Sequence, residues 1–118
     1  MIEGSCHCGA VRYTVETPPE TVMACNCSIC RKLGMLAAHY SPRAVTVTGP
    51  TVTYQWGDRM LVFHHCPNCG CNTHSMPVDP ASDRMSVNAR LMPPEVLAAA
   101  RVRRFDGADT WEFLDEES

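Results

Sequence analysis

Eight cysteines, gathered in three short groups, are the residues of this 118-residue chain whose types and spacing best suit chemistry. They fall in the stretches SCHCG, CNCSIC and HCPNCGC, as Cys6 and Cys8, then Cys25, Cys27 and Cys30, then Cys66, Cys69 and Cys71. The two cysteines of a C-x-C pair are poorly placed for an unstrained disulfide, but both sulfurs can turn toward one metal ion. The pattern therefore predicts metal binding.

Four of these cysteines predict a closed structural zinc site. Structural zinc commonly takes four ligands from two pairs that lie far apart in the sequence. Pairing the first C-x-C with the later C-x-x-C gives such a set, made of Cys6, Cys8, Cys66 and Cys69. A site of this kind contributes on the order of 10 kcal/mol to folding in small zinc peptides. We expect a contribution of that size to be decisive for so small a domain.

The middle group, Cys25, Cys27 and Cys30, has three sulfurs that can occupy three corners of a tetrahedron. Three protein ligands with an exchangeable fourth position are the pattern of catalytic zinc. Three thiolates leave the zinc centre with a net charge of about −1, which suits exchange with a soft incoming thiolate. The alternative is a second structural site closed by Cys71 or by a histidine. Cys71 also fits the role of a small buried hydrophobic residue.

The histidines offer candidates for proton transfer or for a fourth ligand. His74, three residues beyond Cys71, is the preferred candidate, and His65 is the second. His64 and His65 stand next to each other on an expected strand, so alternation sends them to opposite faces. His7 is expected to turn outward and His39 to be packed.

Composition and charge narrow the class of protein. The formal net charge is −3 with only 10 lysines and arginines, which argues against nucleic-acid binding. No apolar run approaches the roughly 20 residues that a membrane-spanning helix needs, so no membrane partner is expected. The sequence starts without a charged leader and an apolar run, which indicates a cytoplasmic, reducing location. There, metal ligation is a commoner use of cysteine than disulfides.

The elements that must position these residues are mostly short strands. Alternating, β-branched stretches predict strands at 10–16, 44–49, 51–56, 60–65 and 83–89, with a turn at Gly49-Pro50. One short helix is expected from Ser28 to a stop at Gly34, and another from about Pro94. The prediction is a mostly β fold: one small zinc-stapled domain, residues 1–118, of short antiparallel strands with one or two short helices. An acidic tail is expected at about 114–118.

Three sequence blocks resemble a known family. GSCHCGAVRYTV, CNCSICRKLG and FHHCPNCGCNTH are similar to the signature blocks of the glutathione-dependent formaldehyde-activating enzyme family, which includes centromere protein V. The stretches NARLM and RRFDGADTWEFLDE resemble family endings. The resemblance implies a zinc-stapled, mostly β fold with Cys6, Cys8, Cys66 and Cys69 on a structural zinc. It implies that Cys25, Cys27 and Cys30 hold a catalytic zinc. CGCNTH departs from the simpler C-G-T-H of the named enzyme, so Cys71 and His74 are expected to complete or retune the second site.

The resemblance also implies a reaction class. We expect a zinc-dependent carbon–sulfur lyase, with two Zn²⁺ per chain, that acts on a small-molecule thiol–aldehyde adduct such as S-hydroxymethylglutathione. The alternatives are a non-catalytic zinc-stabilised binding module and a thiol-based metal or redox sensor.

Overall fold

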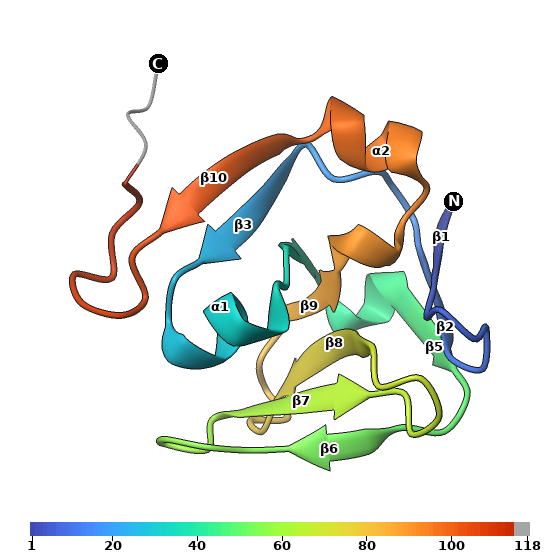
Figure 1. Ribbon diagram of the computed structural model, residues 1–118, viewed down its shortest axis with the longest axis horizontal. Helices are drawn as coiled ribbons and strands as arrows, with labels where there is room; N and C mark the ends of the chain where they lie inside the picture. The colour runs from blue at the N-terminus through green and yellow to red at the C-terminus, as the bar shows by residue number, and fades with distance from the viewer. Residues whose placement is uncertain (115–118) are drawn as a thin grey trace.

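A computed structural model of the chain, which describes residues 1–114, contains two β-sheets (Figure 1). The smaller sheet has three strands in the order β1-β2-β5, where β1 is Ile2–Ser5, β2 is Arg12–Val15 and β5 is Val45–Thr48. Both of its pairings are antiparallel. The turn between β1 and β2 therefore holds Cys6 and Cys8 at one end of this sheet.

The larger sheet has seven strands in the order β10-β3-β4-β9-β8-β7-β6. Its pairings are antiparallel, as predicted, except for that of β10 with β3, which is parallel. The chain reaches that edge through a crossover, which a parallel pair requires. The strands are β3 (Thr21–Cys25), β4 (Ala37–Tyr40), β6 (Val52–Tyr54), β7 (Leu61–His65), β8 (Asn72–Pro77), β9 (Met85–Asn88) and β10 (Arg101–Phe105).

The two helices form where the sequence predicts them. Helix α1 spans Ser28–Leu33 and ends at Gly34, whose φ of 67° is left-handed and whose N–H bonds the Cys30 carbonyl. Glycine adopts this conformation without a Cβ penalty, which explains the stop. Helix α2 spans Pro94–Ala99 and begins with proline, whose missing N–H costs nothing in the first turn. Short 3-10 turns occur at Pro42–Ala44 and Ala89–Leu91.

All five predicted strands are present as β2, β5, β6, β7 and β9, which confirms a mostly β fold. Strands β1, β3, β4, β8 and β10 were not predicted. The sequence does not indicate strand β8, because its buried residues, Asn72 to Ser75, are polar and show no apolar alternation. Of the expected acidic tail, residues 115–118 lie outside the described part of the chain.

The main core lies between the two sheets. It joins Tyr13 and Val15 of β2 to Ala38 of β4 and to Met85 and Val87 of β9. The opposite face of the larger sheet carries a second cluster, in which Met35, Ala37 and Phe63 pack beside Ile29 and Cys30 of α1. The larger sheet therefore has one face on the core and one face on α1.

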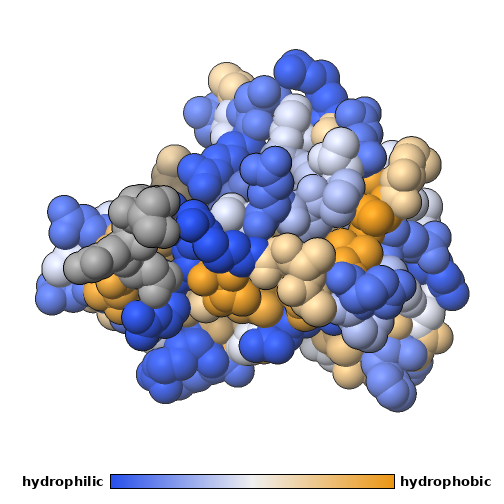
Figure 2. Space-filling model, turned by 90° about the horizontal axis from the view of Figure 1, so that it is seen from above, coloured by the Kyte–Doolittle hydropathy of each residue, from blue (hydrophilic) through white to orange (hydrophobic). Residues whose placement is uncertain are grey.

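Two further observations describe the surface. On the face that carries α2 and β10, hydrophobic residues occur as separate patches among hydrophilic ones (Figure 2). Within residues 1–114, no helix has both the length and the apolar composition needed to span a membrane.

Tyr13 links the two sheets through a buried hydrogen bond and supplies a test of this packing. Its hydroxyl donates to the Asn88 carbonyl at 2.7 Å, and its ring fills the space that a side chain at Gly4 would need. We expect Tyr13→Phe to lower the free energy of unfolding by about 1–3 kcal/mol, because a buried carbonyl loses its donor.

The measurement is urea denaturation of the metal-loaded protein at a fixed zinc concentration. Tyr40→Phe is the matched control, since its hydroxyl bonds the Thr17 carbonyl at 2.8 Å in a solvent-exposed position. An equal loss in both variants would contradict the special role of Tyr13.

Candidate metal centres

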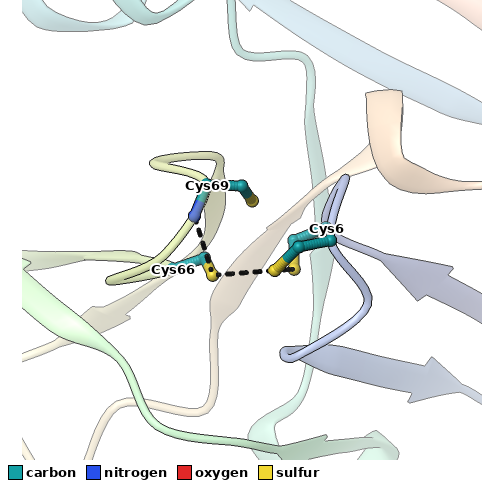
Figure 3. A group of neighbouring side chains, drawn as sticks. Cys6, Cys66 and Cys69 are labelled. Carbon is teal, nitrogen blue, oxygen red and sulfur yellow. Dashed lines mark hydrogen bonds between the residues drawn. The ribbon is translucent and has the colours of Figure 1, made fainter.

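The first centre brings together four cysteines from two turns. Cys6 and Cys8 come from the β1–β2 turn, and Cys66 and Cys69 come from the β7–β8 turn (Figure 3). The Cys8 sulfur lies 3.7 Å from that of Cys6 and 3.6 Å from that of Cys66. Four sulfurs around zinc at about 2.3 Å are roughly 3.8 Å apart in a tetrahedron, so these thiols have the spacing of a zinc site. The group could hold a metal ion.

Backbone N–H groups point at two of these sulfurs. Val11 N lies 3.3 Å from the Cys6 sulfur, and Cys69 N lies 3.4 Å from the Cys66 sulfur. Hydrogen bonds from the backbone of Cys71 and then of Cys8 lower the pKa of the Cys69 thiol to about 5. Zinc binds cysteine as the thiolate, so the low pKa of Cys69 favours metal binding at this centre.

The second centre is made by the triplet, a name used here for Cys25, Cys27 and Cys30. Cys25 ends strand β3, Cys27 is the residue before helix α1, and Cys30 lies within that helix. The sulfurs lie within 4.8 Å of one another, and all three residues are half-buried. Among residues 1–114, no fourth cysteine, histidine or carboxylate joins this group. The triplet could therefore hold a metal ion with one coordination place left to another ligand.

The pKa shifts of the three triplet thiols favour the binding of a cation. Burial raises the pKa of Cys25, and burial together with the Cys27 sulfur raises that of Cys30. Burial also raises the pKa of Cys27, but hydrogen bonds from Cys30 and Cys25 outweigh it and the net shift is downward. Without a cation, the three thiols cannot all ionise side by side, whereas a divalent metal ion reverses this preference. The donor set thus fits a soft divalent ion such as zinc.

A loop from the end of the chain holds the triplet in place. The side chain of Asn26, between Cys25 and Cys27, donates to Asp106 at 3.0 Å and accepts from Ala108 N at 3.0 Å. The Asn26 N–H also bonds the Phe105 carbonyl at 3.1 Å. The parallel pairing of β10 with β3 brings this loop to the triplet, which the sequence spacing did not reveal.

A cavity of about 640 Å³ opens beside the triplet. Its walls come from β3 and α1, from the loop between β6 and β7, and from the segment after β10, whose ribbons lie on one side of the molecule (Figure 1). Besides the triplet, its lining includes His39, Arg84, Asp58 and the apolar side chains Met23, Ile29, Trp56, Met60, Leu61, Phe63, Phe105, Trp111 and Phe113. A metal ion on the triplet would therefore face a cavity of the size that small-molecule ligands occupy.

The strand register separates the histidines. His39, Ser86, Ser75 and Phe63 are paired in one row across β4, β9, β8 and β7, and both ends of that row line the cavity. Directly paired residues point to the same face of a sheet, and their neighbours point to the other. His74, next to Ser75, therefore faces the core side. There its ring stacks on that of His64, with centroids 4.2 Å apart, and its Nδ1 bonds the Thr73 hydroxyl at 2.8 Å.

The remaining candidates from the sequence lie away from the triplet. His65 and His74 are both absent from the cavity lining within the described residues, and His7 is exposed as expected. Cys71 packs against the first centre, beside Cys6 and Cys66, and does not close the second. His39, expected to be packed, instead lines the cavity wall, where part of its surface is open to solvent and part is covered by protein. Desolvation and the charge of Arg84 lower its pKa to about 4, so its imidazole is neutral at pH 7.

The two centres predict opposite outcomes for cysteine substitution. Cys6→Ser is expected to leave poorly folded protein, because a four-ligand site contributes its binding free energy to folding. Cys27→Ser is expected to keep the fold and lose one metal ion. Circular dichroism and metal analysis per chain check both results. Aggregation of both variants would argue against two centres with different roles.

Gly107 gives a more local test of the triplet. A Cβ at this position would lie 2.5 Å from the Cys25 sulfur and 3.4 Å from Cys27 Cβ. We expect Gly107→Ala to displace the Cys25 sulfur and to weaken metal binding at the triplet by about 10–100-fold, as disturbed ligand orientation does elsewhere. The first centre should be unaffected.

Competition with a chelator that reports free zinc measures this change. Ala108→Gly, which removes a methyl group from the same loop and keeps its backbone bond to Asn26, is the control. Equal metal affinity in Gly107→Ala and the unaltered protein would show that the loop does not set the position of Cys25.

Comparison with known proteins adds the family context. The family model described as glutathione-dependent formaldehyde-activating enzyme matches residues 1–103. A Halomonas elongata protein named "Putative glutathione-dependent formaldehyde-activating enzyme" is 61% identical over 33 residues, 27% of this chain and 21% of that protein. The matched region thus spans about a fifth of that relative. A crystal structure of a Rhodobacter sphaeroides protein is similar with a TM-score of 0.70 and 30% identity, covering 85% of this chain and 98% of that one.

Proposed function

The chain belongs to the glutathione-dependent formaldehyde-activating enzyme family, and from that premise we propose that it is a zinc-dependent carbon–sulfur lyase. Its substrate would be a thiol–aldehyde adduct such as S-hydroxymethylglutathione. The observation that carries the proposal is the position of the triplet, which lines a cavity of about 640 Å³ to whose described lining the four-cysteine group does not contribute. In this proposal each chain binds two zinc ions, a structural one at the first centre and a catalytic one at the triplet.

The proposed reaction is the reversible cleavage of a hydroxymethyl thioether, R–S–CH₂–OH, into a thiol and formaldehyde. The electrons of the C–S bond leave with sulfur, those of the O–H bond form the carbonyl, and the hydroxyl proton passes to a base. When bound to the triplet, zinc supplies a position that accepts the sulfur as thiolate and lowers the pKa of the thiol. The side chains of the cavity bind and orient the adduct.

His39 is the proposed proton acceptor. Its imidazole lines the same cavity as the triplet and is neutral near pH 7, as a general base must be. The sequence predicts proton transfer by His74 or His65. In this proposal, His39 transfers the proton instead. His74 is buried on the other face of the sheet, and its Nδ1 is already bonded to Thr73. A cytoplasmic location would suit this chemistry, since all eight cysteines are unpaired.

The activity is tested by incubating zinc-loaded protein with formaldehyde and a panel of thiols, and measuring adduct formation above the spontaneous rate. Removal of the more readily chelated ion, or Cys27→Ser, should abolish the excess rate, because both empty the triplet. No excess with any thiol, together with two equally inert metal ions, would favour a non-catalytic zinc module instead.

His39→Gln should lower the turnover rate by roughly 100-fold with unchanged metal content, since general acid–base catalysis contributes about 10²–10⁴-fold. His7→Gln, at an exposed position, is the control. A larger loss of turnover rate in His74→Gln or His65→Gln than in His39→Gln would contradict this role of His39. It would support proton transfer by the histidines that the sequence predicts.

A further inference from the structure

The cavity beside the triplet concentrates large apolar side chains that are open to solvent. Trp56, Met60, Leu61, Trp111 and Phe113 are each at least 40% exposed, and all five line this one cavity. They belong to two segments far apart in the sequence, the β6–β7 loop with the first residue of β7, and the stretch after β10. Exposed apolar residues gathered at a concave site mark a binding surface, whereas single ones are ordinary. Their convergence on a candidate metal centre indicates a small-molecule ligand with an apolar body.

The inner wall of the cavity is also apolar. Phe63 is buried at 4% exposure and packs with Met35 and Ala37 under the cavity, beside Cys30. Phe105 contacts both Trp111 and Phe113 edge to face, with ring centroids 5.5 and 5.1 Å apart. These aromatic contacts hold the segment from Phe105 to Phe113 together as one wall of the cavity. An apolar group that extends from a sulfur on the triplet would therefore meet aromatic side chains.

Charged groups on the cavity lining are few. Among the described residues, Arg84 is its one positively charged side chain, and it lies close enough to His39 to lower the pKa of that ring. Asp58 also lines the cavity, and its carboxylate accepts from the Met60 N–H at 3.1 Å. One cation suits a ligand with one carboxylate.

Glutathione matches this lining poorly. It carries two carboxylates, an ammonium group and two amides, and polar groups buried without partners cost free energy. The cavity offers one cation, the Asp58 carboxylate and a single imidazole against a majority of apolar side chains, too few polar groups to pair with all of those on glutathione.

We propose that the cavity selects adducts of thiols with an aromatic or branched aliphatic body and a single carboxylate, with the body on Trp56, Phe105 and Trp111 and the carboxylate toward Arg84. This inference rests on the proposed function, because it names the substrate class of the same site. The reaction is the same balanced cleavage, in which R–S–CH₂–OH gives the apolar thiol and formaldehyde.

The protein carries its own reporter for this test. Its two tryptophans, Trp56 and Trp111, both line the cavity, so their emission responds to a ligand bound there whether or not turnover occurs. Zinc-loaded protein is titrated with four thiols: 2-benzyl-3-mercaptopropanoate, 3-mercaptopropanoate, 3-phenylpropane-1-thiol and glutathione. They separate the effect of the apolar body from that of the carboxylate.

We expect 2-benzyl-3-mercaptopropanoate to bind at least about tenfold more tightly than 3-mercaptopropanoate and glutathione, as one apolar group in a fitted pocket allows. Met60→Gln should weaken this binding several-fold. Val102→Gln is the matched control, because Val102 is 49% exposed against 54% for Met60 and lies outside the cavity. Arg84→Gln should bring the two aromatic thiols to nearly equal affinity.

The binding and turnover measurements separate the two proposals. Binding of glutathione as tight as that of the aromatic thiols would overturn the inference even if glutathione is turned over. A preserved preference for the aromatic carboxylate thiol, without turnover of any adduct, would uphold the binding preference and overturn the lyase. Emission that changes with protein concentration alone would also overturn the inference, in favour of self-association through the apolar rim.

Discussion

The four-sulfur contact between the β1–β2 turn and the β7–β8 turn is the constraint on which the rest of the structure depends. It joins Cys8 to Cys66, 58 residues later, and thereby ties the three-stranded sheet to the seven-stranded one. A metal ion held there contributes on the order of 10 kcal/mol or more, which is comparable with the whole stability of a small domain. The core between the sheets and the buried Tyr13–Asn88 hydrogen bond are further contacts that join the same two sheets.

The two cysteine groups differ in what surrounds them. The first group has four sulfurs, of which Cys6 and Cys66 are buried, and it lies between two turns that both belong to the framework. The second group has three sulfurs on the wall of a cavity, and its supporting loop comes from the far end of the chain. A complete ligand set favours a fixed ion, while an incomplete one beside a cavity favours ligand exchange. In the proposed function, cysteine–metal chemistry therefore serves architecture at the first centre and reactivity at the triplet.

The parallel pairing of β10 with β3 connects the edge of the fold to the second centre. It places Phe105 opposite Cys25 and lets the following loop bond Asn26 on both sides of its amide. The same segment contributes Trp111 and Phe113 to the cavity. The geometry of the triplet and the apolar character of the cavity thus both depend on β10, the last strand in the sequence of the described residues. Loss of the pairing between β10 and β3 is expected to affect metal binding and ligand choice together.

The local features could be predicted from the sequence, because they depend on residues close together in the chain. The C-x-C and C-x-x-C spacings brought out both cysteine groups, β-branched alternation located five strands, and Gly34 and Pro94 marked a helix end and a helix start. The identity of the side chains around the triplet could not be predicted in this way. His39 and Arg84 reach the cavity through strand order and register, and the buried polar strand β8 turns His74 to the core side. Such placements depend on pairings between distant segments, and a shift of one residue in register would reverse them.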